Sequence, residues 1–149
     1  MSRLAIVRHG KYGSDYRLND QGRAQIQTLA ERLNQSFDYE QEIALVLSSI
    51  APRAIDTAEI IAQILQAPVE THELLWSENS HPENLEEAYK LVQSSRNRAD
   101  LLVLVTHYEY TEELPALFGR RDLSQRFYQH VKKGEGIILN YRDKYIARI

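Results

Sequence analysis

Short apolar runs, each long enough for one β-strand, most constrain the fold of this chain. They lie at residues 4–7, 43–47 and 101–105, and polar residues follow each of them at once. Runs of this length without polar alternation are typical of strands buried on both faces of a sheet. The segments between them have apolar residues at the spacing of amphipathic helices. This alternation predicts an α/β fold with three layers, in which helices cover both faces of a mostly parallel central sheet.

Capping residues and prolines indicate where the helices begin. A helix of about 15 residues is expected after a cap at Asn19 or Asp20. Pro52 and Pro82 suit the first turns of a second and a third helix, where the missing N–H is not needed. A shorter fourth helix is expected over 111–118, with the glycine that follows it as its end.

Further short strands are expected at 69–75, 136–141 and 144–149. The last two are interpreted as a hairpin that extends the sheet, with at least one strand antiparallel. Residues 120–133 show no readable pattern. With no internal repeat or flexible linker, the 149 residues are predicted to form a single domain, 1–149.

Composition excludes several classes of protein. The formal net charge of -3 is unlike that of a nucleic-acid-binding protein. The absence of cysteine excludes disulfides, thiolate zinc sites and a cysteine nucleophile. No stretch approaches the length of a membrane span, and the apolar run at 4–7 is too short for the core of a signal peptide. We therefore expect a cytoplasmic protein that binds neither nucleic acid nor membrane.

Basic side chains follow the buried strands at one edge of the predicted sheet. Arg8 and His9 follow the first strand, two serines and then Arg53 follow the second, and His107 follows the run at 101–105. Parallel strands bring these ends together, and ligands of open α/β sheets bind there. Arginine matches phosphate oxygens with paired hydrogen bonds, and a helix N-terminus adds positive potential. A neutral histidine nitrogen is nucleophilic, so the sequence predicts a phosphoryl-transfer site.

A metal centre is the alternative for a pair of histidines. The neighbouring arginines disfavour a cation, and no carboxylate accompanies either histidine in the sequence. We therefore expect neither a metal nor another cofactor.

Sequence motifs in the same regions resemble those of the histidine phosphatase superfamily, which includes the cofactor-dependent phosphoglycerate mutases. Arg8-His9-Gly10 after a first strand resembles its signature. The other matching motifs are Leu18-Asn19-Asp20-Gln21-Gly22-Arg23-Ala24-Gln25, Ser48-Ser49 with Arg53-Ala54 and Thr57-Ala58-Glu59, and Val105-Thr106-His107. The resemblance covers most of the chain and implies a phosphoglycerate mutase-like fold.

The resemblance also implies roles for individual residues. His9 is the expected nucleophile, which becomes phosphohistidine. Arg8, Arg53 and His107 are expected to hold the phosphoryl oxygens. Ser14, in the polar loop after the first strand, is included as a substrate-binding residue.

The family usually has a carboxylic acid after the third strand, which protonates the leaving group. The candidates here are Glu78, Glu73 and Glu83. Glu78 is favoured because it follows the end of the expected strand. Glu73 is expected within that strand, and Glu83 in the first turn of the next helix, where a carboxylate suits the helix dipole.

The chain departs from the family pattern in a few places. Pro52 lies two positions later than the family's proline, Asn19 replaces a threonine, and Tyr108-Glu109 follows the second histidine, where small residues are commoner. We expect that a carboxylate at that position tunes or narrows the site.

Size narrows the expected subclass. About fifty residues separate Arg53 from His107, which leaves no room for the cap that larger members insert there. This build resembles the small SixA-like phosphohistidine phosphatases. An open pocket suits a phosphorylated protein, including phosphohistidine, or a small phosphate ester. It does not suit a mutase, which must keep water from its phosphoenzyme. A catalytically idle phosphate-binding module on the same fold is the alternative function, and mutase activity is the less favoured one.

Overall fold

The computed structural model describes residues 1–77 and 82–149. In this part of the chain, six strands form one sheet in the order β3-β2-β4-β1-β5-β6. The strands are β1 Arg3–Arg8, β2 Ala44–Ser48, β3 Val69–Thr71, β4 Leu101–Thr106, β5 Gly136–Asn140 and β6 Tyr145–Arg148. The α-helices are α1 Asp20–Gln35, α2 Pro52–Leu65, α3 Pro82–Ser95 and α4 Tyr108–Leu123, and the 3-10 helices are η1 Glu73–Leu75 and η2 Arg96–Arg98. None of the helices in these two ranges is long and apolar enough to cross a membrane.

The sheet is parallel on one side of β1 and antiparallel on the other. β1 pairs in parallel with β4, which pairs in parallel with β2, and β2 pairs in parallel with β3. On its other side β1 pairs antiparallel with β5, and β5 pairs antiparallel with β6. β1 therefore lies inside the sheet with a partner on each side, as its apolar sequence predicts.

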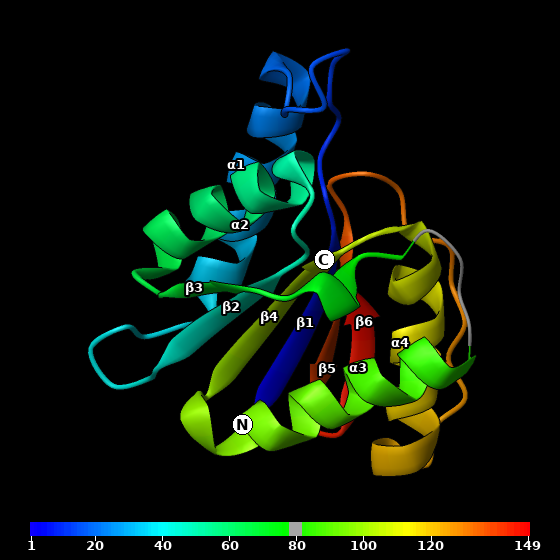
Figure 1. The fold of residues 1–149 in the computed structure, drawn as a ribbon. Coiled ribbons are helices and arrows are strands. Elements are labelled where there is room, and N and C mark those ends of the chain that lie inside the picture. Colours follow the sequence, from blue (N-terminus) through cyan, green and yellow to red (C-terminus); the bar gives the residue numbers. More distant parts are fainter. Residues whose placement is uncertain (78–81) are drawn as a thin grey trace.

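Two helices cover each face of the sheet (Figure 1). Ala5 and Val7 of β1 pack with α1 and α2 in one core. Leu4 and Ile6 point to the opposite face and pack with α3 and α4 in a second core. The strand is buried from both sides, so the predicted three-layer α/β fold is confirmed.

The helix starts confirm the expected caps. Asn19 caps α1, because its side-chain oxygen accepts a hydrogen bond of 2.8 Å from the Gly22 N–H. Pro52 and Pro82 begin α2 and α3 as predicted. Gly22 also lies so close to the loop after β1 that an added Cβ would be 2.0 Å from the Lys11 carbonyl oxygen. The glycine thus lets α1 pack directly against the loop that follows Arg8 and His9.

The strand expected at 69–75 is shorter in the structure. β3 ends at Thr71, because its register with β2 extends only from Val69 to Thr71. Glu73 lies in η1, and its expected place in a strand is therefore wrong. The turn of η1 brings Leu75 into the core, where its carbonyl accepts a hydrogen bond of 2.7 Å from Thr106.

The fourth helix is longer than predicted at both ends. It begins at Tyr108, directly after His107, and continues to Leu123. Gly119 does not end it but lies inside it, with Ile146 Cδ1 and the Gln125 carbonyl oxygen 2.8 and 3.0 Å from the position of an added Cβ. The absence of a side chain here permits close packing rather than a helix end.

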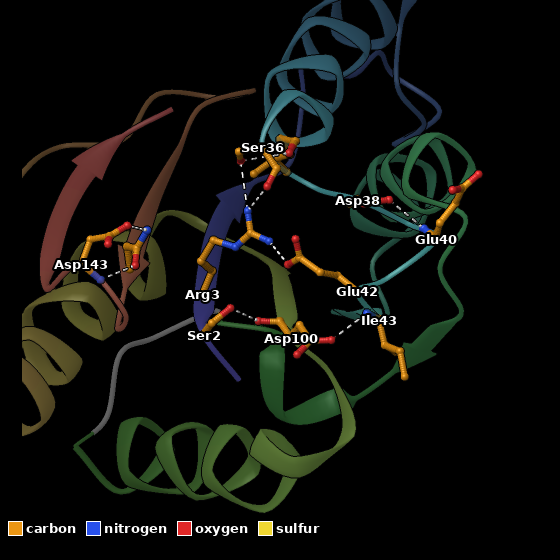
Figure 2. Close-up of polar contacts among 11 residues, drawn as sticks. Ser2, Arg3, Ser36, Asp38, Glu40, Glu42, Ile43, Asp100 and Asp143 are labelled. Atoms are coloured by element: carbon orange, nitrogen blue, oxygen red, sulfur yellow. Dashed lines mark hydrogen bonds and ion pairs between the residues drawn. The ribbon is translucent and has the colours of Figure 1, made fainter.

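A polar network holds the opposite end of β1 (Figure 2). The Arg3 side chain is 8% exposed and pairs with Glu42. It also donates hydrogen bonds to the carbonyl oxygen of Ser36 and, at 3.1 Å, to the Ser36 hydroxyl. The start of β1 is thereby tied to the end of α1 and to the loop before β2.

Candidate active site

A pocket of about 240 Å³ lies at the carboxyl ends of β1 and β4. Arg8 ends β1 and His9 follows it, whereas His107 follows β4 and directly precedes α4. Arg53 reaches the same place from the first turn of α2. The lining residues are Arg8, His9, Tyr12, Arg53, Ser77, His107, Tyr108, Glu109 and Lys133. The structure thus brings together Arg8, His9, Arg53 and His107, the four residues from which the sequence predicts a phosphoryl-transfer site.

The buried His9 presents one nitrogen as an electron-pair donor. Its Nδ1 lies 2.9 Å from the Gly10 carbonyl oxygen, which can only accept, so Nδ1 carries the proton. Its Nε2 accepts a hydrogen bond of 3.3 Å from Nε of Arg53. The lone pair of the neutral ring therefore resides on Nε2, beside the guanidinium.

The surroundings of His9 keep it neutral. Burial lowers its pKa from 6.5 to about 3; the hydrogen bond to Gly10 opposes this shift, and the charges of His107, Arg53 and Arg8 reinforce it. A neutral imidazole is the form that attacks phosphorus. His9 is thus in its nucleophilic form at neutral pH.

His107 lies beside His9, with 5.2 Å between the ring centroids. The hydroxyl oxygen of Ser49, at the end of β2, lies 2.7 Å from Nε2 of His107 and orients the ring. Burial, reinforced by the charges of Arg53 and Arg8, lowers the pKa of His107 to about 4. The two histidines therefore add no positive charge at neutral pH, and the arginines supply it.

Aromatic rings and a threonine hold Arg53 in place. Its guanidinium lies 4.8 Å from the ring centroid of Tyr12 and 5.8 Å from that of Trp76. Thr57, one turn further along α2, donates a hydrogen bond of 2.8 Å to the Arg53 carbonyl and accepts one of 3.2 Å from the Gly10 N–H. Thr57 thus links the first turn of α2 to the residue after His9.

Arg8 has an unused hydrogen-bond donor. One terminal nitrogen donates to the Val131 carbonyl at 3.0 Å, and the guanidinium lies 5.1 Å from the Tyr108 ring centroid. Its Nε is buried and has no hydrogen-bond partner among residues 1–77 and 82–149. Burial lowers the pKa of Arg8, and nearby acidic groups, first Tyr108 and then Glu109, oppose that shift. An unsatisfied cationic N–H beside the pocket suits an anionic ligand.

A buried carboxylate holds the loop that carries Tyr12. Asp56 of α2 accepts hydrogen bonds of 2.8 and 2.6 Å from the Arg17 guanidinium and one of 3.1 Å from the Leu18 N–H. Burial alone raises the pKa of Asp56, but the hydrogen bonds from Arg17 and Leu18 outweigh it, so its pKa lies below the ordinary value. Asp56 thus acts on the pocket through the loop.

Among the remaining predicted residues, Ser14 and Glu73 are described by the structure and do not line the pocket. Ser14 is exposed on its loop, and Glu73 is exposed on η1. Glu78 lies outside the described residues, as does the side chain of Glu83. The identity of the proton donor among these carboxylates therefore stays a prediction.

Lys133 and Ser77 also line the pocket without a counterpart in the sequence prediction, whereas Glu109 was expected to tune or narrow the site. Lys133 comes from 120–133, where no pattern was readable, and its ammonium lies 4.8 Å from the Tyr12 ring centroid. Ser77 enters because η1 turns the chain back toward β4. The sequence pointed to Glu109, because the pair Tyr108-Glu109 after His107 departs from the family pattern. It accepts a hydrogen bond of 2.6 Å from the Ser77 hydroxyl.

Comparisons with known proteins agree with this geometry. Among curated proteins, phosphoglycerate mutase-like protein 4 of Arabidopsis thaliana is 42% identical over 69 residues, which cover 40% of this chain and 28% of that protein. The chain therefore matches less than a third of that relative's length.

Solved structures share the fold over nearly the whole chain. A candidate phosphohistidine phosphatase SixA from Nakamurella multipartitia has a TM-score of 0.73 at 18% identity, covering 92% of this chain and 83% of that one. The protein histidine phosphatase SixA complexed with tungstate has a TM-score of 0.71 at 16% identity, covering 99% and 94%. A mycobacterial glucosyl-3-phosphoglycerate phosphatase has a TM-score of 0.66 at 18% identity, covering 100% and 97%.

A family-wide sequence comparison gives the assignment. The sequence model described as histidine phosphatase superfamily (branch 1) matches residues 4–79, a segment that contains Arg8, His9 and Arg53. The pocket adds His107 from beyond that segment. The chain belongs to the histidine phosphatase superfamily.

Proposed function

We propose that the protein is a metal-independent phosphatase that acts through a phosphohistidine on His9. The observation that carries this proposal is the Nε2 lone pair of a neutral, buried histidine beside the guanidinium of Arg53. Arg8 and His107 line the same pocket. Membership of the histidine phosphatase superfamily supports the assignment.

The reaction proceeds in two steps. In the first, Nε2 of His9 attacks phosphorus and the bond to the leaving group breaks, while Arg8, Arg53 and His107 stabilise the phosphoryl oxygens. In the second, water attacks the phosphohistidine, phosphate leaves, and the electron pair returns to Nε2. An acid protonates the leaving group in the first step, and Glu78 is the candidate that the family resemblance favours.

The proposed substrate is a phosphorylated protein, including phosphohistidine, or a small phosphate monoester. The pocket lies among the ends of strands rather than under an inserted cap: between Arg53 and His107 the described residues form α2, β3, η1, α3, η2 and β4. Such a site admits a phosphoryl group on a large molecule. The shared fold with the SixA structure that holds tungstate, a phosphate-like anion, supports this choice.

Trapping tests the mechanism. Brief mixing with a ³²P-labelled phospho-donor, followed by denaturing electrophoresis at alkaline pH, is expected to show acid-labile label on the wild type and none on His9→Ala. Mass spectrometry of a rapidly quenched digest locates the label. Sustained turnover by His9→Ala would overturn the mechanism.

A catalytically idle phosphate-binding module is the competing outcome. It predicts binding of inorganic phosphate in calorimetry without turnover of a phosphohistidine protein or of any ester in a panel of aryl and alkyl phosphates. Turnover of one of these substrates, lost in His9→Ala, excludes that outcome.

A further inference from the structure

A carboxylate is among the groups that line the cationic pocket. Glu109, in the first turn of α4, lines the pocket together with Arg8, His9, Arg53 and His107. Its Oε2 accepts a hydrogen bond of 2.6 Å from the Ser77 hydroxyl. Ser77 is itself buried, so this contact fixes the carboxyl group at the pocket wall.

A purely structural role does not account for this arrangement. A carboxylate in the first turn of a helix stabilises the helix through its dipole, wherever the side chain points. Glu109 instead reaches across to Ser77 on a different segment and faces the phosphate-binding groups. Glu109 is therefore placed where its carboxyl group can exchange a proton with the leaving group of a phosphate ester bound in the pocket.

We propose that Glu109 is the proton donor to the leaving group, with Ser77 as the residue that positions it. This inference rests on the proposed phosphatase function and moves the acid from the segment after the third strand to α4. In the first step the His9 Nε2–phosphorus bond forms and the bond from phosphorus to the leaving oxygen breaks. The Glu109 carboxyl proton passes to that oxygen, which leaves Glu109 as a carboxylate.

The second step restores the acid. The Glu109 carboxylate takes a proton from the attacking water as the water oxygen bonds to phosphorus. The phosphorus–Nε2 bond breaks, its electron pair returns to His9, and phosphate leaves. Glu109 is then protonated again, so the cycle balances without any further reactant. The hydrogen bond from Ser77 occupies Oε2 and leaves Oε1 for the proton transfer.

Leaving-group dependence gives the decisive test, because a proton donor matters most for a poor leaving group. Glu109→Gln keeps the size of the side chain and removes the proton. We expect its kcat on phenyl and alkyl phosphates to fall by about 100-fold or more. On aryl phosphates whose phenols are more acidic than phenol itself, such as p-nitrophenyl phosphate, we expect a loss of less than about 5-fold.

Matched variants separate this role from others. Glu113→Gln changes an identical side chain on α4 that does not line the pocket, and it should keep the wild-type leaving-group dependence. Glu78→Gln tests the rival acid in the same assay. Ser77→Ala should weaken turnover of phenyl phosphate while sparing p-nitrophenyl phosphate. Binding of inorganic phosphate and the melting temperature show that Glu109→Gln remains folded.

The outcomes distinguish the two proposals. A Glu109→Gln enzyme that loses the same factor on every leaving group, or a Glu78→Gln enzyme that alone shows the selective loss, overturns the assignment to Glu109. Wild-type protein that labels on His9 still supports the phosphatase in that case. Wild-type protein that neither labels nor turns over any ester overturns the phosphatase and the proton donor together.

Discussion

Nε of Arg53 donates its hydrogen bond directly to Nε2 of His9, over 3.3 Å. The guanidinium that is suited to phosphoryl oxygens therefore lies against the nitrogen suited to attack phosphorus. Two different elements create this contact, because His9 follows β1 and Arg53 lies in the first turn of α2. Small displacements between α2 and β1 should consequently affect both phosphate binding and attack.

Replacement of Arg53 tests that contact. Lysine keeps the charge but lacks the planar fork that binds two phosphate oxygens, and it cannot stack on Tyr12 in the same way. For Arg53→Lys we expect kcat/KM to fall by about 100-fold or more, the scale for loss of one donor to developing charge. Steady-state kinetics and calorimetry with inorganic phosphate measure the loss. A variant within about 3-fold of the wild type would contradict the role given to Arg53.

The two histidines make stability depend on pH. Their pKa values are about 3 for His9 and about 4 for His107 in the folded protein, below the ordinary 6.5. Above pH 6.5 the two histidines are neutral in the folded and in the unfolded protein, so their titration does not lower the free energy of unfolding. As the pH falls from 6.5 towards these values, the unfolded chain gains protons that the folded one excludes. The unfolding free energy should then fall by up to about 1.4 kcal/mol per pH unit for each histidine.

Urea unfolding at pH 7, 6 and 5 measures this slope. His9→Gln should have a smaller slope than the wild type, because one of the two contributions is removed. Equal slopes for the two proteins would contradict the burial of a neutral His9.

Gly22 should tolerate no side chain. Gly22→Ala places a Cβ 2.0 Å from the Lys11 carbonyl oxygen, so α1 and the loop must separate. We expect a loss of about 3 kcal/mol, the upper end of the usual range for overpacked sites, together with lower activity. Gly13→Ala, whose Cβ would meet only Asp15 at 3.4 Å, is the matched control on the same loop. Comparable melting temperatures for the two variants would contradict the close approach.

Asp56 should influence substrate binding from a distance. Asp56→Asn weakens the paired hydrogen bonds to Arg17 and loosens the loop that bears Tyr12. Because Arg17 is half exposed, we expect a modest stability loss of about 1–2 kcal/mol, with KM rising more than kcat falls. Thermal unfolding and kinetics compare it with Glu59→Gln, an exposed carboxylate on the same helix. An unchanged KM would contradict the positioning role.

The sequence predicted most of the fold because its strongest patterns reflect burial. The runs at 4–7, 43–47 and 101–105 are strands, and Asn19 and Pro52 begin helices as expected. The prediction that Gly119 ends the fourth helix was wrong, because a glycine suits both a helix C-cap and a close contact with another element. Only the position of Ile146, from a distant strand, decides between them.

The residues of the candidate site were also predictable only where burial leaves a pattern in the sequence. Arg8, His9, Arg53 and His107 follow directly from the strand ends. Lys133 could not be predicted, because it reaches the pocket through an irregular segment. That segment runs along α4 in Figure 1, held by the contacts of Tyr128 and His130 with Glu112. Such contacts between side chains distant in sequence leave no periodic signal.

The strand order also has a consequence for synthesis of the protein. β1 is made first, but its partners β4 and β5 come from residues 101–106 and 136–140. At ordinary rates of translation, on the order of ten seconds pass between the synthesis of β1 and the synthesis of both partner strands, β4 and β5. A nascent chain that already contains His9 and Arg53 therefore has no complete pocket. Premature termination should yield chaperone-bound or aggregated fragments rather than partially active enzyme.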